Sequence, residues 1–137
     1  MNYRTFDYMN RWTLRLKHKH KPIPKWITFV VSLGCLICKA PCQFSHTVPK
    51  AAKGACSDVL GHGICGEHHE FGATSIHVLG SIEEFQRVHK IDFNEALLMY
   101  WTMFLQQHGR DIEKELGPCK TKQQVIEKME SLINELA

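Results

Sequence analysis

The sequence lacks an apolar run long enough to cross a membrane, and it contains no internal repeat. Its longest mostly apolar stretch covers residues 26–37. A helix that spans a bilayer needs roughly 20 apolar residues, so this stretch is too short. These absences exclude a repeat architecture and a membrane-spanning helix in this stretch, and the length of 137 residues favours one domain with an N-terminal arm.

Acidic residues are scarce at the start of the chain. Residues 1–25 carry seven Lys or Arg and one Asp, a balance of +6, whereas residues 81–137 carry seven basic and ten acidic groups. A basic arm with interspersed Tyr and Trp suits a nucleic-acid backbone, although charge alone is equally compatible with a solvated tail. The expected DNA contacts in this arm are Arg11, Arg15, Lys17, Lys19, Lys21 and Lys25.

The basic arm followed by residues 26–37 imitates a signal peptide, and Ser32–Cys35 imitates a lipidation site. Cleavage or lipidation at Cys35 would consume a cysteine that has an obvious partner at Cys38. We therefore expect a cytoplasmic protein, and keep an exported cysteine-rich protein as the alternative.

The pattern of residues predicts an α+β protein in three parts. These are a basic arm (1–25), a metal-binding core (26–92) and C-terminal helices that pack on the core (93–137). Residues 26–33 are apolar enough for a short helix or a strand, because periodicity does not separate the two. We expect a short strand over residues 43–48, a loop over 49–63, and a helix from Gly66 that is interrupted at residues 72–75.

The C-terminal part carries clear helix signals. Ser81–Glu84 is a capping box, Asp92–Glu95 is an Asp-led version, and Thr121 precedes a last helix. The broad apolar face over residues 96–105 ends at Gly109. This face would bury within the domain or pair with a second chain, which leaves a homodimer open.

Two pairs of metal ligands share a two-residue gap: Cys35 with Cys38, and Cys65 with His68. This spacing lets each pair reach one ion from a tight turn, and two pairs complete a tetrahedral zinc site. Such a closed site is structural, and it can contribute about 10 kcal/mol or more to folding. Cys42 and Cys56 remain candidate spare ligands, and Cys119 is expected to be an unpaired thiol.

Three further histidines, His46, His69 and His77, exceed what a structural zinc site needs. One imidazole acting as a general base on water, with others holding a divalent ion against a phosphate, suffices for phosphodiester cleavage. Histidine suits the base role because its unperturbed pKa is about 6.5. From spacing alone they could equally be extra zinc ligands or surface groups.

These residues resemble a known family. The series from Trp26 to about Phe93 is similar to the HNH endonuclease superfamily, and most similar to its phage-associated recombination-enhancement (Ref-like) nucleases. The matching elements are Cys35–Cys38, Ser45-His46, Ser57-Asp58, Ile64–His69, Ile76-His77, Phe85 and Lys90–Asp92. The resemblance covers roughly half of the chain.

The resemblance implies a ββα-metal (His-Me finger) core and metal-dependent DNA cleavage in a phage or prophage setting, with a recombination partner from phage or host. Cys35, Cys38, Cys65 and His68 would hold structural zinc. His46 would be the general base. His69 and His77 would bind the catalytic Mg²⁺ or another divalent ion.

The chain departs from the family pattern at two positions. Ser45 replaces the His or Asp that usually precedes the base and helps to bind the catalytic ion. The Asn of the motif's name has no clear match, and Asp58 and His62 are candidate substitutes. These departures support a rival hypothesis, a zinc-binding adaptor that binds DNA or protein on the same scaffold without catalysis.

Overall fold

The computed structural model describes residues 22–47 and 57–136. It is a mixed α+β structure with one small antiparallel sheet, as the sequence predicts at this coarse level. The elements in chain order are α1 (Pro24–Ser32), β1 (Gln43–Ser45), η2 (Asp58–Leu60), β2 (His62–Ile64), η3 (Glu67–Phe71), α2 (Ile76–Leu79), α3 (Ile82–His89), α4 (Phe93–Gln107), α5 (Ile112–Leu116) and α6 (Lys122–Leu136).

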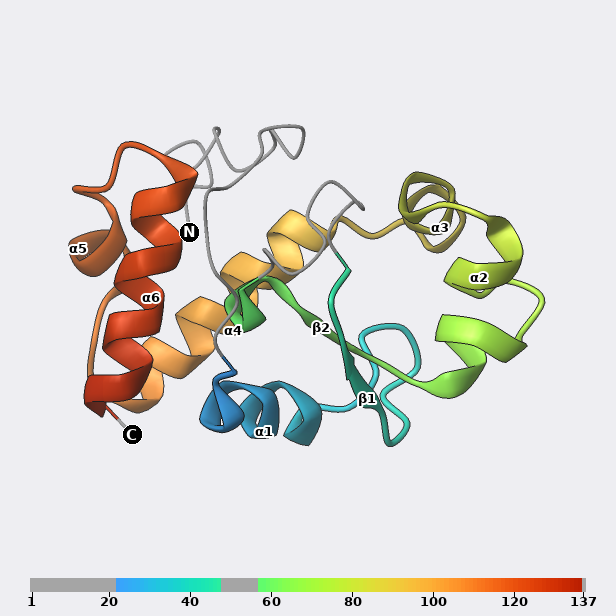
Figure 1. The fold of residues 1–137 in the computed structure, drawn as a ribbon, viewed down its shortest axis with the longest axis horizontal. Helices are drawn as coiled ribbons and strands as arrows, with labels where there is room; N and C mark the ends of the chain where they lie inside the picture. The colour runs from blue at the N-terminus through green and yellow to red at the C-terminus, as the bar shows by residue number, and fades with distance from the viewer. Residues whose placement is uncertain (1–21, 48–56, 137) are drawn as a thin grey trace.

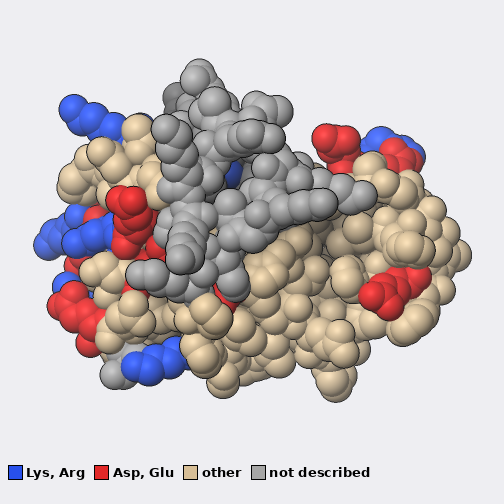
Figure 2. Space-filling model, in the orientation of Figure 1, with Lys and Arg blue, Asp and Glu red and all other residues tan. Residues whose placement is uncertain are grey.

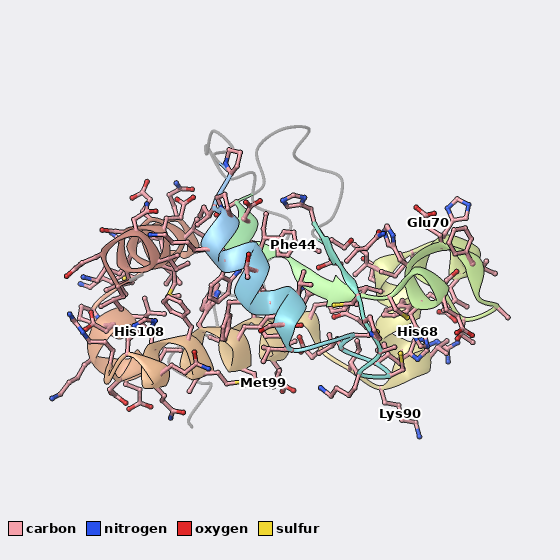
Figure 3. The ribbon with its side chains drawn as sticks, turned by 90° about the horizontal axis from the view of Figure 1, so that it is seen from below. Phe44, His68, Glu70, Lys90, Met99 and His108 are labelled. Carbon is pink, nitrogen blue, oxygen red and sulfur yellow. The ribbon has the colours of Figure 1, made fainter. Side chains whose placement is uncertain are left out.

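The molecule is elongated, with a group of helices at each end (Figure 1). Helices α5 and α6 lie at one end, and η3, α2 and α3 lie at the other. Helix α4 runs across the middle, with the two strands and α1 beside it. Figure 3 shows the same division from below, with His68 and Glu70 at one end and His108 at the other.

The sheet is a short hairpin-like pair in which β1 and β2 run antiparallel. Its register places Gln43 opposite Ile64 and Ser45 opposite His62. Phe44 packs its ring on Gly61 so closely that a Cβ there would lie 2.1 Å from the ring (Figure 3). A side chain at position 61 would therefore require the Phe44 ring to move.

Residues 24–32 form a helix, which settles the ambiguity between helix and strand. Pro24 occupies the first turn, where its missing N–H costs no hydrogen bond. Trp26 and Val30, one helical turn apart, are fully buried. The helix ends before Gly34, whose φ of +81° turns the chain toward the first cysteine pair.

The predicted caps of the C-terminal helices are confirmed. The Ser81 hydroxyl accepts from the Glu84 N–H at 3.1 Å, and the Thr121 hydroxyl accepts from the Gln124 N–H at 3.2 Å. The Asp92 carboxylate accepts from the two N–H groups of Asn94 and Glu95. Helix α5, which begins after a further cap at Asp111, was not expected.

The predicted strand over residues 43–48 and loop over 49–63 are partly wrong. The strand is shorter and ends at Ser45, so His46 follows it. The later part of the expected loop contains the 3₁₀ helix η2 and strand β2, which begins at His62. Residues 48–56 lie outside the described residues.

Two hydrophobic clusters of unequal size lie inside the described residues. The larger joins α1 and η2 to α4, α5 and α6, with Trp26, Trp101 and Tyr100 among its largest side chains. The smaller contains only three fully buried side chains, Ile64, Phe85 and Phe93, and lies beside the cysteine pairs.

Candidate metal centre and neighbouring histidines

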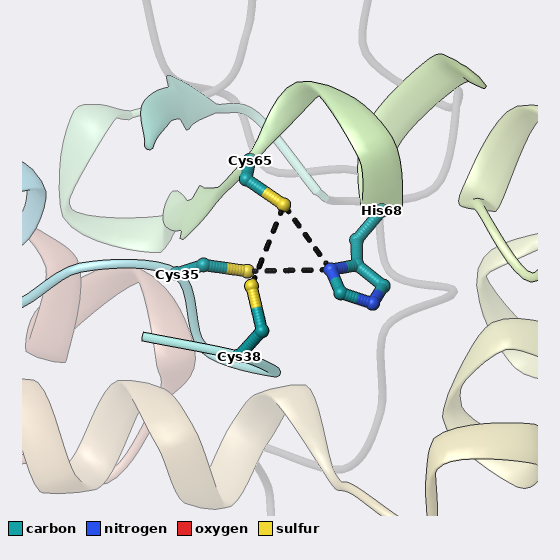
Figure 4. Close-up of side chains that lie close together, drawn as sticks. All are labelled: Cys35, Cys38, Cys65 and His68. Carbon is teal, nitrogen blue, oxygen red and sulfur yellow. Dashed lines mark hydrogen bonds between the residues drawn. The ribbon is translucent and has the colours of Figure 1, made fainter. Parts of the chain in front are cut away.

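The four predicted zinc ligands converge at one point (Figure 4). Cys35, Cys38, Cys65 and His68 each offer one ligand atom, and these atoms all lie within 4.8 Å of one another. Cys35 and Cys65 are buried, His68 is partly buried, and Cys38 is exposed. The cluster therefore has one open side, formed by Cys38.

The spacings within the cluster fit tetrahedral coordination. With Zn–S distances of about 2.3 Å, two ligating sulfurs lie about 3.8 Å apart, and a sulfur and an imidazole nitrogen lie about 3.5 Å apart. The Cys38 and Cys65 sulfurs are 3.7 Å apart. The His68 Nδ1 atom lies 3.1 Å from the Cys65 sulfur and 3.8 Å from the Cys35 sulfur. This Cys₃His set could bind a metal ion and is compatible with structural zinc.

The first cysteine pair is held by a tight turn. The N–H of Cys35 donates to the Ala40 carbonyl at 2.8 Å, and the N–H of Lys39 donates back to the Cys35 carbonyl at 2.9 Å. Lys39 has a φ of +65°, and Gly34 has the positive φ that opens the turn. The N–H of Leu36 donates to the Gly63 carbonyl of β2, which fixes the turn to the sheet.

The second pair lies where β2 leads into η3, a single π-helical turn. Its wide turn is marked by the Gly72 N–H, which donates to the Glu67 carbonyl at 2.7 Å. Turns of this kind are rare and are often found at functional sites. Here the turn carries both His68, which faces the cysteines, and His69.

The environment favours a thiolate at Cys35. Burial alone would raise the pKa of this thiol, but hydrogen bonds from the backbone of Cys38, Cys65 and Ile37 lower it to about 6. For Cys65 burial dominates and raises the pKa of the thiol. The cluster thus favours the thiolate of Cys35 but disfavours a second thiolate at Cys65. A bound cation suits such a cluster, because its positive charge would stabilise both thiolates.

The remaining cysteines do not join this group within the described residues. The Cys42 thiol lies 3.7 Å from the Val31 carbonyl, to which it donates, and burial raises its pKa. Cys119 is a free thiol, as predicted, and burial raises its pKa as well. Cys56 lies outside the described residues.

His46 forms a short contact with a buried acid. Its Nε2 atom lies 2.7 Å from Oδ1 of Asp58, whose side chain is 1% exposed, whereas the imidazole is 42% exposed. The other carboxylate oxygen, Oδ2, accepts from the Ile23 N–H at 2.7 Å. The ring also packs edge-on against Phe44, with centroids 5.2 Å apart. His46 is thus anchored on one side and open to solvent on the other.

His69 lies beside Ser45, the residue that precedes His46. Its Nε2 atom is 3.4 Å from the Ser45 hydroxyl, and its Nδ1 atom is 3.7 Å from a Glu70 carboxylate oxygen. His77 is an exposed residue of α2. In the described part of the chain, only the Cys₃His cluster brings three or more candidate ligand atoms within 4.8 Å. His46, His69 and His77 do not form a second such group.

His62, considered as a substitute for the missing Asn, is fully buried. It contacts the Thr47 hydroxyl, and its Nε2 atom lies 2.8 Å from the Phe93 carbonyl. Burial lowers its pKa to about 4, only partly opposed by the bond to Phe93. His62 therefore connects the sheet to the start of α4. Asp58, the other candidate substitute, contacts His46 directly.

Of the expected DNA contacts, only Lys25 lies in the described part, where it is exposed on α1. Arg11, Arg15, Lys17, Lys19 and Lys21 lie outside it. On the face drawn in Figure 2, most of the visible Lys and Arg lie, mixed with acidic groups, at the end formed by α5 and α6, and further groups of both signs are visible at the α3 end.

Within residues 22–47 and 57–136, none of the helices has both the length and the apolar character needed to cross a bilayer. Comparison of the chain with models of protein families, with curated proteins and with solved structures found no match.

Proposed function

We propose that this protein is a metal-dependent DNA endonuclease of the HNH type. The observation that carries the proposal is the arrangement at the end of β1, where Ser45 contacts His69 and His46 contacts buried Asp58. The Cys₃His cluster, at the opposite end of the sheet, brings the turn of residues 35–40 beside η3, the turn that carries His69.

His46 acts as the general base in this proposal. Its imidazole is anchored through Nε2, and its exposed side leaves room for a water molecule next to a scissile phosphate. The cations of residues 1–25 hold the DNA backbone, so binding weakens steeply as salt is raised. We place the reaction in phage or prophage DNA metabolism on the family resemblance alone.

The ligand atoms of His69 and His77 bear on which catalytic ion would bind here. His69 offers an imidazole nitrogen, and His77 is a second candidate ligand on the neighbouring helix. Imidazole suits transition metals such as Ni²⁺ and Zn²⁺ better than Mg²⁺, which prefers oxygen ligands. A divalent ion held there would neutralise charge on the phosphate and stabilise the leaving oxygen. The activity assay therefore compares Mg²⁺, Mn²⁺ and Ni²⁺.

A zinc-binding adaptor without catalysis is the second candidate. It is favoured by Ser45, which is a poor metal ligand, and by the lack of a second three-ligand group among the described residues. It predicts salt-sensitive DNA binding without cleavage under any of the three ions.

Plasmid nicking by the wild-type chain and by His46→Ala tests the proposal. We expect the substitution to lower the nicking rate by roughly 10²- to 10⁴-fold, the usual contribution of a general base, with zinc content unchanged. His108→Ala is the matched control, because His108 follows α4 at the end of the molecule away from His68 and Glu70 (Figure 3). Equal nicking by His46→Ala would exclude His46 as the base, and wild-type chain that binds but never nicks DNA would support the adaptor.

A further inference from the structure

We infer that Asp58 is a positioning residue that holds His46 in a single tautomer, with the proton on Nε2 and the lone pair on Nδ1. Asp58 lies at the start of η2, and its carboxylate bridges two groups from distant parts of the chain. One oxygen is 2.7 Å from His46 Nε2, and the other accepts from the Ile23 N–H at 2.7 Å. Its catalytic meaning rests on the nuclease function proposed above.

The carboxylate is held in place by the packing of η2. The Trp101 indole N–H donates to the Val59 carbonyl at 3.0 Å, and the Ser57 hydroxyl donates to a Glu130 carboxylate at 3.0 Å. Val59 and Leu60 are buried in the larger hydrophobic cluster. Helices α4 and α6 therefore fix the position of Asp58, although neither helix contributes a side chain to the proposed reaction.

The hydrogen-bond chemistry then decides the tautomer. An ionised carboxylate only accepts hydrogen bonds, so a neutral imidazole that bonds to it must carry its proton on the bonded nitrogen. At His46 this nitrogen is Nε2, which leaves Nδ1 as the acceptor. A general base takes up a proton through a lone pair, so Asp58 favours the tautomer in which Nδ1 of the ring can take a proton from water.

Asp58→Asn tests the inference with little change in shape. The asparagine amide has one acceptor oxygen, whereas the two donors at this site, the Ile23 N–H and the His46 Nε2–H, each need an acceptor. If the amide oxygen stays with Ile23, its NH₂ group faces His46 Nε2 and favours the opposite tautomer. Asp111→Asn is the matched control, because Asp111 caps α5 through the Lys114 N–H and the same substitution there leaves His46 untouched.

Two readouts separate this inference from the proposed function. The ¹⁵N chemical shifts of the His46 ring, measured on zinc-loaded protein at pH 8.5, report the tautomer without any activity. We expect the wild type and Asp111→Asn to show the Nε2–H form and Asp58→Asn to gain the Nδ1–H form. The nicking rate of Asp58→Asn should fall by roughly 10²- to 10⁴-fold, as expected for a base held in the wrong tautomer.

An unchanged His46 tautomer in folded, zinc-loaded Asp58→Asn would overturn the inference. So would full nicking activity by this variant under conditions where His46→Ala is inactive. If the wild-type chain does not nick DNA, the proposed function fails, and the ring shifts alone decide whether Asp58 positions His46.

Discussion

The buried histidine His62 shows how a single residue can make folding depend on pH. Its ring is fully buried, between the sheet and the start of α4, and its pKa lies near 4 rather than the usual 6.5. The folded state thus holds this imidazole neutral under conditions where an unfolded chain would protonate it. Nothing in the local sequence marks His62 for this role, because both of its partners, Thr47 and Phe93, are distant in the chain.

We predict that His62 lowers the stability of the protein in mild acid. Between about pH 6.5 and pH 4, His62 is protonated in the unfolded state but stays neutral in the folded state. The free energy of unfolding therefore falls as the pH decreases through this window, by up to about 3 kcal/mol. Chemical denaturation at pH 7.5, 6 and 5 measures the decrease. His62→Gln, which keeps a polar side chain without a titrating group, should flatten the decrease, and an equal decrease in both proteins would contradict the prediction.

At the scale of the elements, the turn that carries Cys35 and Cys38 depends on Gly34. Its φ of +81° is unfavourable for other residues, and a Cβ at this position would lie 2.6 Å from the Lys39 carbonyl oxygen. Gly109 also has a positive φ, but it has open space around the Cβ position. Alanine at Gly109 therefore measures the cost of the backbone angle alone, whereas alanine at Gly34 adds the cost of a steric clash.

We predict that Gly34→Ala destabilises the protein more than Gly109→Ala. The φ angle alone costs roughly 1–2 kcal/mol at either site, and the clash at Gly34 adds to it and displaces the turn that presents the two cysteines. Thermal unfolding should rank the variants, and zinc titration should show weaker binding only for Gly34→Ala. Equal losses in both variants, with zinc affinity intact, would show that the turn tolerates a side chain.

The elements predicted from sequence are those whose signals are local. The caps at Ser81, Asp92 and Thr121 bond to N–H groups two or three residues away, so the sequence alone predicts them. The ligand pairs were predictable for the same reason, since each spans a single turn. Strand β2 was missed because its three residues pair with residues of β1 that lie 17 to 21 positions earlier in the chain. The contact between His46 and Asp58 also depends on tertiary packing, which no local pattern encodes.

At the scale of the whole molecule, the two ends are stabilised differently. The larger hydrophobic cluster holds α1, α4, α5 and α6 together through many buried aliphatic and aromatic side chains. Among the described residues, the other end has only Ile64, Phe85 and Phe93 as its buried hydrophobic cluster, and neither η3 nor α2 contributes a buried side chain to it. An end with so little apolar burial needs another source of stability, and the Cys₃His cluster is the candidate.

We predict that the Cys₃His cluster binds zinc, and that removal of this zinc unfolds the end formed by η3, α2 and α3 but leaves the end formed by α5 and α6 folded. Amide hydrogen exchange after chelation should increase strongly over residues 65–79 and remain slow in α4 and α6, because the larger cluster does not depend on the metal. Cys38→Ser should reproduce this pattern, whereas Cys42→Ser, whose thiol bonds to the Val31 carbonyl instead, should keep its zinc. If exchange over residues 65–79 were equally slow with and without zinc, or if both variants lost the metal alike, the cluster would not be what stabilises this end.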